Sequence, residues 1–127
     1  MIEDNCEAWA YGPVFPDIYE KYKTQGNSAI LDYDKSIDDS DLFSSDELRV
    51  LDYVVECFGI YNGYVLMKLT HKERPWIEAR AGIPEFIPSS NIINNETIYN
   101  YFDEKNKKYS LHTVDGVNAY IRALGVI

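Results

Sequence analysis

The sequence predicts an α+β domain that is predominantly helical, a compact helical fold with one or two short strands. Apolar residues recur every three or four positions in several segments, and capping residues precede some of these segments. The chain has 127 residues, and its eleven Tyr, five Phe and two Trp supply ample apolar surface for a core. We therefore expect one folded domain over residues 1–127 and not a disordered chain.

Composition and cysteine usage predict the cellular compartment of the protein. No apolar run approaches the roughly 18–20 residues that a membrane helix needs. The start, Met1–Asn5, carries two acids and lacks the apolar centre of a signal peptide. Cys6 and Cys57 lie far apart without a CxxC spacing, so two reduced thiols are favoured over the alternative of a disulfide. We expect a soluble, cytoplasmic protein that binds no membrane.

The strongest local signals belong to a helix over residues 44–58. Ser44 as N-cap and Glu47 three residues later form a capping box, and Phe43 with Leu48 forms a hydrophobic staple. Gly59 is expected to end the helix in the left-handed conformation that glycine tolerates best. The side expected to be buried carries Leu48, Leu51, Val55 and Phe58, widened by Val54.

The other elements are predicted from the same kinds of signal. A helix is expected over 17–22, followed by an acidic loop over 32–41. Further helices are expected over 62–70, from Pro75, from the N-cap Asn94 to about residue 108, and from residue 115 to Gly125. The short strands are expected at residues 29–31 and 109–114.

The negative charge is concentrated in the first half of the chain. Residues 1–56 hold fourteen acids against four bases, whereas residues 57–127 hold seven acids against eight bases. Such a surface repels phosphate backbones, so we expect no direct nucleic-acid binding, even though the helices over 44–58 and 62–70 resemble a helix-turn-helix pair. The acids are either a solvated surface or a surface that steers toward a basic partner, and Asp38, Asp39 and Asp41 are its candidate partner-binding residues.

The sequence contains no recognisable catalytic or metal-binding pattern. Its two histidines, His71 and His112, are 41 residues apart and no HExxH, CxxC or paired-carboxylate spacing accompanies them. No nucleophile elbow and no glycine-rich phosphate loop is found. We expect no enzyme, no cofactor and no metal. His71 is either a structural residue that a backbone group or Glu73 satisfies, or a residue that contacts a partner.

Residues 9–14 place two large aromatic side chains directly before a Gly-Pro turn. Trp9 and Tyr11 flank Ala10, and Gly12-Pro13 follows. One interpretation is a rigid turn with both rings in the core. The other is a fixed aromatic surface of the kind that anchors protein interfaces, since Trp and Tyr dominate binding hot spots. Trp76 has the same two interpretations.

Two separated stretches together point to a known family. Residues 7–14 read EAWAYGPV and are followed by PDIY over 16–19, and residues 66–76 read LMKLTHKERPW. The first stretch resembles the EAWxYGPVxPxxY signature of the Panacea (SocA-like) domain, and the second resembles its LsxLTHxExPW segment. The helix over 44–59 and an IxxYF element at 98–102 also match, so the resemblance covers about residues 6–103.

The resemblance implies a mainly helical domain that binds proteins and has no catalytic residues. Members of the family look like phage-associated proteins and antitoxins that neutralise diverse toxins by direct contact, and one branch resembles a protease adaptor that delivers its toxin for degradation. The motif residues hold the fold together, touch the toxin, or do both; they are Trp9, Tyr11, Gly12, Pro13, Thr70, His71, Pro75 and Trp76.

The chain also departs from the family pattern. Members usually begin with a helix of the KLxKLxYYA type, whereas only six residues precede Glu7 here. The resemblance then implies an apolar groove that lacks its usual helix, and exposed apolar surface of this kind marks an interaction site. The groove is expected to be filled by the additional C-terminal strand and helix over 109–127, by a second copy, or by a partner.

The preferred function is therefore a protein-binding module of the antitoxin type that neutralises a toxin by direct contact. The alternative is a phage-encoded inhibitor of a host defence or regulatory protein, anti-CRISPR-like or a nucleic-acid mimic, that acts through its acidic face. The expected partner is a basic protein, and a homodimer is a further alternative. The candidate partner-binding residues are Trp9, Tyr11, Gly12, Pro13, Asp38, Asp39, Asp41, His71 and Trp76.

Overall fold

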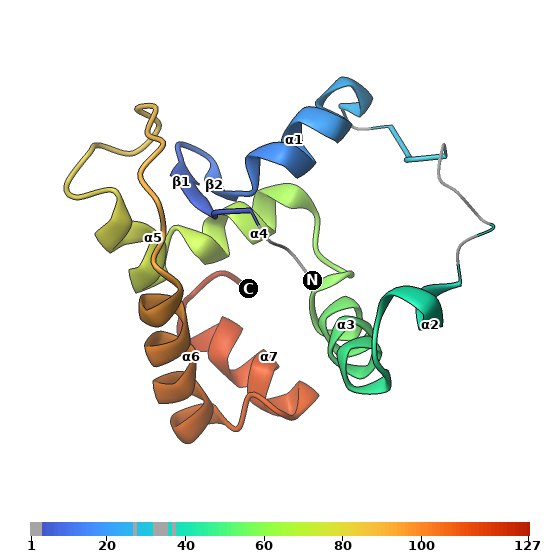
Figure 1. The fold of residues 1–127 in the computed structure, drawn as a ribbon. Helices are drawn as coiled ribbons and strands as arrows, with labels where there is room; N and C mark the ends of the chain where they lie inside the picture. Colours follow the sequence, from blue (N-terminus) through green and yellow to red (C-terminus); the bar gives the residue numbers. More distant parts are fainter. Residues whose placement is uncertain (1–3, 27, 32–35, 37) are drawn as a thin grey trace.

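Helices form most of the fold, with one β-hairpin near the start of the chain (Figure 1). The structure is a computed structural model that describes residues 4–26, 28–31, 36 and 38–127. Its strands and first helices are β1 (Glu7–Trp9), β2 (Gly12–Val14), α1 (Pro16–Tyr22), the 3₁₀-helix η1 (Lys23–Gln25) and α2 (Asp39–Leu42). The later helices are α3 (Ser45–Phe58), α4 (Gly63–Thr70), α5 (Arg74–Ala79), α6 (Asn95–Tyr109) and α7 (Val114–Ala123). The predicted α+β, predominantly helical fold class is thus confirmed.

The hairpin is a small antiparallel sheet with an extended neighbour. Glu7 pairs with Val14 and Trp9 with Gly12, so only Ala10 and Tyr11 form the connecting loop. On the other side of β1, the segment 91–93 runs alongside: the Ala8 N–H donates to the Asn91 carbonyl at 2.8 Å, and the Ile93 N–H donates to the Cys6 carbonyl at 2.8 Å. The hairpin is therefore anchored by a segment about 80 residues later in the chain.

Two clusters of buried side chains form the core. The smaller cluster joins the hairpin to α5 and the segment before α6, through Cys6, Ala8, Trp76 and Ile93. The larger cluster joins four helices and the C-terminal residues, through Cys57, Leu69, Tyr101, Val117, Tyr120, Ile121 and Val126. Cys6 and Cys57 lie in different clusters and both are free thiols, as predicted. Burial raises the pKa of the Cys6 thiol.

Several predicted helix boundaries are confirmed. The Ser44–Glu47 capping box is present in both directions at the start of α3. Asn94 caps α6 by accepting a hydrogen bond from the Glu96 N–H, and Pro75 lies in the first turn of α5. These signals act between residues no more than three apart, so the sequence alone carries them.

The positions predicted for the short strands are wrong. Residues 29–31 adopt no strand. Of residues 109–114, Tyr109 ends α6, residues 110–113 form the turn and Val114 begins α7: Ser110 is left-handed with φ 57°, and the Thr113 N–H and Oγ1 both donate to its carbonyl. The predicted acidic loop over 32–41 is also wrong in part, because Asp39–Leu42 form α2, while residues 32–35 and 37 lie outside the described part of the chain.

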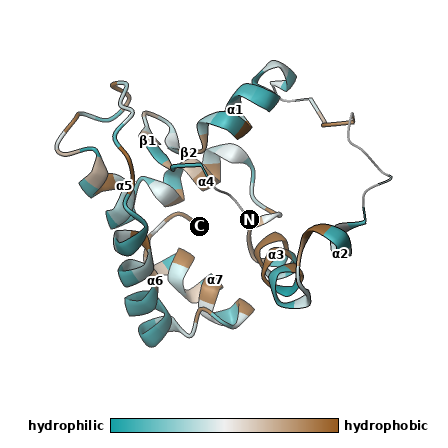
Figure 2. Ribbon diagram, in the orientation of Figure 1, coloured by the Kyte–Doolittle hydropathy of each residue, from teal (hydrophilic) through white to brown (hydrophobic). Residues whose placement is uncertain are grey.

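The buried side of α3 matches the predicted one only in part, because Leu48, Leu51 and Phe58 are half-buried as predicted but Val54 and Val55 are exposed. Val55 is 68% exposed and Val54 is 46% exposed, whereas Tyr53, Cys57 and Phe58 pack into the larger cluster. Apolar residues occur on several sides of this helix, and the elements that pack against it, α7 among them, decide which part is covered (Figure 2). Gly59 is not left-handed either: its φ of −65° continues the right-handed turn that leads to the Asn62 cap of α4.

Candidate partner-binding site

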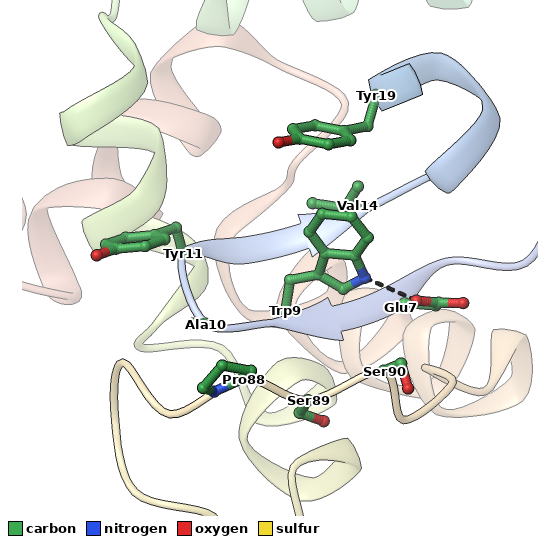
Figure 3. A pocket seen from close by; sticks show the side chains of 9 residues that line it. All are labelled: Glu7, Trp9, Ala10, Tyr11, Val14, Tyr19, Pro88, Ser89 and Ser90. Carbon is green, nitrogen blue, oxygen red and sulfur yellow. Dashed lines mark hydrogen bonds between the residues drawn. The ribbon is translucent and has the colours of Figure 1, made fainter. Parts of the chain in front are cut away.

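A groove of about 600 Å³ lies beside the β1–β2 hairpin (Figure 3). The hairpin supplies one wall, α1 covers one end, and the segment 88–90 forms the other side. Its lining is mostly apolar and aromatic, which is typical of surfaces that bind ligands or peptide segments. The lining residues are Glu7, Trp9, Ala10, Tyr11, Val14, Tyr19, Pro88, Ser89 and Ser90.

Three aromatic side chains are presented at this groove. Trp9 is half-buried, and its indole N–H donates to Glu7 Oε2 at 2.7 Å, which fixes the orientation of the ring. Tyr19 from α1 packs edge-on against Trp9, with the ring centroids 4.9 Å apart. Tyr11 at the hairpin tip is 71% exposed and lies 5.5 Å from the Phe86 ring. The groove therefore offers preorganised aromatic surface to a partner.

Gly12 allows the hairpin to sit directly against α4. Its backbone φ of +126° lies in a region that residues with a side chain rarely adopt. A Cβ at this position would also lie only 3.2 Å from Thr70 Oγ1. Gly12 is buried, while the neighbouring Pro13 is exposed. The two long sequence motifs thus meet at this contact, because one supplies Gly12 and the other supplies Thr70.

Trp76 lies beneath the hairpin and has a structural environment. It is 6% exposed, and its indole N–H donates to the Trp9 carbonyl at 2.9 Å. The His71 ring stacks on it at a centroid distance of 4.0 Å. His71 Nδ1 bonds to Glu85 Oε1 at 2.8 Å, so the predicted partner Glu73 is wrong. Glu73 lies instead toward α7, where it meets Tyr120.

Arg80 completes this region and was missed by sequence reasoning. It is 2% exposed, and its guanidinium lies 4.9 Å from the Trp76 ring centroid. It donates to the carbonyl oxygens of Ala8 at 3.1 Å, Pro84 at 2.8 Å and Ile87 at 2.6 Å. A single arginine after a short helix has no pattern that distinguishes it from a surface residue. Only the fold shows that Arg80 ties the hairpin to the loop that borders the groove.

Comparison with known proteins identifies the family. Residues 1–77 match the family model described as antitoxin SocA-like, Panacea domain. The chain belongs to the Panacea domain family. Searches of curated proteins and of solved structures return no match.

The matched part of this Panacea domain contains the hairpin, α3, α4 and most of α5, including Trp9, Tyr11 and Trp76. The larger core cluster extends beyond the match. Cys57 and Leu69 come from the matched part, whereas Tyr101, Val117, Tyr120, Ile121 and Val126 come from the later helices and the C-terminal residues. The C-terminal segment therefore packs against α3 and α4, which belong to the matched part.

The predicted acidic residues lie away from the groove, on and beside α2 (Figure 1). Asp38 and Asp41 are exposed, and the side chain of Asp39 lies outside the described residues. The Asp38 carboxylate accepts from the Ser40 N–H at 2.9 Å and from its hydroxyl at 2.8 Å, and these bonds lower the pKa of Asp38. The structure thus separates the predicted site residues into an exposed aromatic group, a buried group and an acidic group.

A second cluster that sequence reasoning missed links α5 to α6 and α7. The Tyr120 hydroxyl donates to Glu73 Oε1 at 2.6 Å and lies 2.9 Å from the Tyr101 hydroxyl. Burial raises the pKa of Glu73, and the hydrogen bond from Tyr120 opposes that rise. The cluster contains one carboxylate, and across the described residues no three His, Cys, Asp or Glu side chains gather as metal ligands would.

None of the helices in the described part of the chain is both long and apolar enough to span a lipid bilayer.

Proposed function

We propose that this Panacea domain is an antitoxin that binds a toxin protein directly and neutralises it through the aromatic groove of the β1–β2 hairpin. The observation that carries the proposal is the exposure of Tyr11 and Tyr19, at 71% and 44%, around an apolar groove of about 600 Å³. Exposure of large apolar side chains to water is unfavourable, and their burial against a partner contributes favourable free energy to binding. Membership of an antitoxin-like family supports a toxin as that partner.

The proposed partner is basic. The protein has a formal net charge of −9, and exposed acids on α2 and α3 include Asp41, Asp46 and Asp52. A negative surface raises the association rate with a positive partner, and this increase falls as the ionic strength rises. The two free, buried thiols support a reducing compartment, so we place the interaction in the cytoplasm.

The first test is rescue of growth when the protein is co-expressed with a toxin encoded beside its gene. Tyr11→Ala removes an exposed ring at the hairpin tip and is expected to weaken toxin binding by about 30-fold, the size of a hot-spot residue. Trp9→Ala should act in the same direction. The matched control is Tyr99→Ala, because Tyr99 on α6 is equally exposed at 71% and does not line the groove.

Binding measured by calorimetry should weaken for Tyr11→Ala while the far-UV circular dichroism spectrum stays unchanged. Equal rescue by Tyr11→Ala and Tyr99→Ala would show that the groove is not the toxin-binding surface. Sedimentation of the toxin-free protein would show whether the groove is instead covered by a second copy. Faster toxin degradation in the presence of the protein would indicate a protease adaptor.

A second candidate function rests on the acidic surface of α2 and α3, which lies apart from the groove. In this alternative the protein is a phage-encoded inhibitor that captures a host defence or regulatory protein, with its carboxylates in place of nucleic-acid phosphates. The combined variant Asp41→Asn, Asp46→Asn and Asp52→Asn distinguishes the two. It should abolish inhibition in the alternative, whereas antitoxin rescue through the groove should lose only the contribution of long-range attraction.

A further inference from the structure

We infer that the groove beside the hairpin takes an arginine side chain of the partner, with the guanidinium stacked on Trp9 and bonded to Glu7. This inference rests on the proposed function and specifies the chemistry that the groove recognises. It concerns the rings of Trp9, Tyr11 and Tyr19 and the single carboxylate among the lining residues.

Several aromatic rings of the described chain have a lysine or arginine of the protein over them, whereas the rings of the groove do not. Arg80 lies over Trp76 at 4.9 Å, Lys68 over Tyr64 at 5.0 Å and Lys105 over Tyr101 at 4.9 Å. In the described part of the chain, no lysine or arginine lies over Trp9, Tyr11 or Tyr19 in this way. Since Trp gives the strongest attraction between a cation and an aromatic ring, the part of the Trp9 ring that lines the groove and is not packed against Tyr19 is suited to a cation supplied by a partner.

Glu7 provides the matching anion at the same place. Its Oε2 accepts from the Trp9 indole N–H at 2.7 Å, so the carboxylate is held at the edge of the ring (Figure 3). Among the described residues, no donor is bonded to Oε1, and none of the ion pairs involves Glu7. An approaching guanidinium can therefore stack on the indole and donate to the free oxygen at the same time.

These two contacts favour arginine among basic side chains. The guanidinium is planar and stacks on aromatic faces, and its donors are arranged to meet a carboxylate. The remainder of the groove, with Val14, Pro88 and Tyr19, offers apolar surface along which the methylene groups of the arginine and its neighbours can lie. The net charge of −9 adds long-range attraction for a cationic segment.

The experiment is an NMR titration of the ¹⁵N-labelled full chain with the peptide acetyl-Gly-Arg-Gly-amide. The protein has two tryptophans, so its indole N–H region reports the groove through Trp9 and the interior through the buried Trp76. We expect a saturable shift of the Trp9 indole signal at millimolar peptide and an unchanged Trp76 signal. The matched peptide acetyl-Gly-citrulline-Gly-amide has the same shape without the charge, and it should bind at least about tenfold more weakly.

The variant Glu7→Gln separates charge recognition from folding. Glutamine keeps an acceptor for the Trp9 indole N–H, so the ring should stay in place and the Trp76 signal should not move. Affinity for the arginine peptide should fall about tenfold, the effect of losing a charge-assisted hydrogen bond. Equal binding of the citrulline peptide, an unchanged affinity of Glu7→Gln, or tighter binding of adenosine would overturn the inference. Toxin rescue that depends on Tyr11 while the arginine peptide fails to bind would leave the proposed function standing and remove only this inference.

Discussion

Arg80 carries a positive charge into the interior and satisfies three backbone carbonyls there. Arg80→Met keeps much of the side-chain volume but removes the guanidinium donor from the Ala8 and Ile87 carbonyls, whereas the Pro84 carbonyl still accepts from the Ile87 N–H, so we expect a loss of about 3 kcal/mol in the free energy of unfolding. Urea denaturation of the wild type and the variant measures this loss of stability. The control is Arg122→Met on the exposed part of α7, which should change stability by less than about 0.5 kcal/mol. Equal stability of the two variants would contradict the structural role of Arg80.

Glu73 predicts a pH dependence with a defined sign. Because burial raises its pKa in the folded state, the folded protein holds the Glu73 proton more tightly than the unfolded chain does. The stability contributed by protonated Glu73 is then fully present below the pKa of the unfolded chain and is lost as the pH rises through the raised pKa of the folded state.

The variant Glu73→Gln tests this sign, because glutamine accepts from Tyr120 without a charge. We expect the variant to gain stability relative to the wild type as the pH is raised from about 4 to 7.5. Urea denaturation at several pH values gives the difference, and Glu96→Gln, on the exposed first turn of α6, serves as the control. A difference that does not change with pH would show that Glu73 titrates normally.

The turn between α6 and α7 depends on a close backbone approach at Gly116. A Cβ at this position would lie 2.2 Å from the carbonyl oxygens of both Tyr109 and Ser110, and backbone atoms cannot move aside as flexible side chains do. Gly116→Ala is therefore expected to cost at least about 2 kcal/mol of stability. Thermal unfolding followed by circular dichroism provides the measurement.

Gly63 at the start of α4 is the matched control, since a Cβ there would meet nothing within 4 Å. Gly63→Ala should stabilise the protein by about 0.5–1 kcal/mol, because alanine loses less conformational entropy than glycine in a helix. Similar effects at the two glycines would mean that α6 and α7 do not approach each other as closely as described.

Individual helices were predictable where the signal is local. The N-caps Ser44 of α3 and Asn94 of α6, and Pro75 in the first turn of α5, act on residues that lie within one helical turn. The full extent of the buried side of α3 was not predictable. Val50 and Val54 are as apolar as Cys57, so the sequence does not distinguish them. Cys57 is buried because α4 and α7 pack against it, whereas the two valines stay 56% and 46% exposed.

At the scale of the whole molecule, the helices beyond the family match complete the core. Deletion of residues 110–127 removes Val117, Tyr120, Ile121 and Val126 from the larger cluster and exposes Cys57 and Leu69. We expect the shortened protein to lose cooperative unfolding, because the deletion removes four of the seven buried residues of this cluster. Deletion of Ile127 alone, which is 52% exposed, is the control.

Urea transitions and amide NMR spectra of the shortened protein provide the measurement. A folded, equally stable protein without residues 110–127 would show that the Panacea motif is an independent unit. It would also show that the packing of the C-terminal segment against α3 and α4 does not stabilise those helices.

The candidate site was predictable in part. The aromatic stretch from Trp9 to Pro13 stands out in the sequence because large rings rarely adjoin a Gly-Pro turn, and the structure places Trp9 and Tyr11 at a groove. The sequence did not determine which aromatic residues of the motifs are exposed and which are buried. Tyr11 is exposed while Trp76 is buried, and this difference arises from the contact of Trp76 with the Trp9 carbonyl, His71 and Arg80.

By itself, the sequence determined the helical fold class, several helix starts and the membership of the Panacea family. These properties are encoded in short motifs and in caps that act between residues a few positions apart. Only the tertiary structure decided where the hairpin pairs, which part of α3 is covered, that Arg80 is buried and that Glu73 is half-buried against Tyr120. The physical reason is distance along the chain: Arg80 binds the carbonyl of a residue 72 positions away, and Glu73 binds a tyrosine 47 positions away. No local pattern specifies such contacts, because they form only when the whole chain has packed.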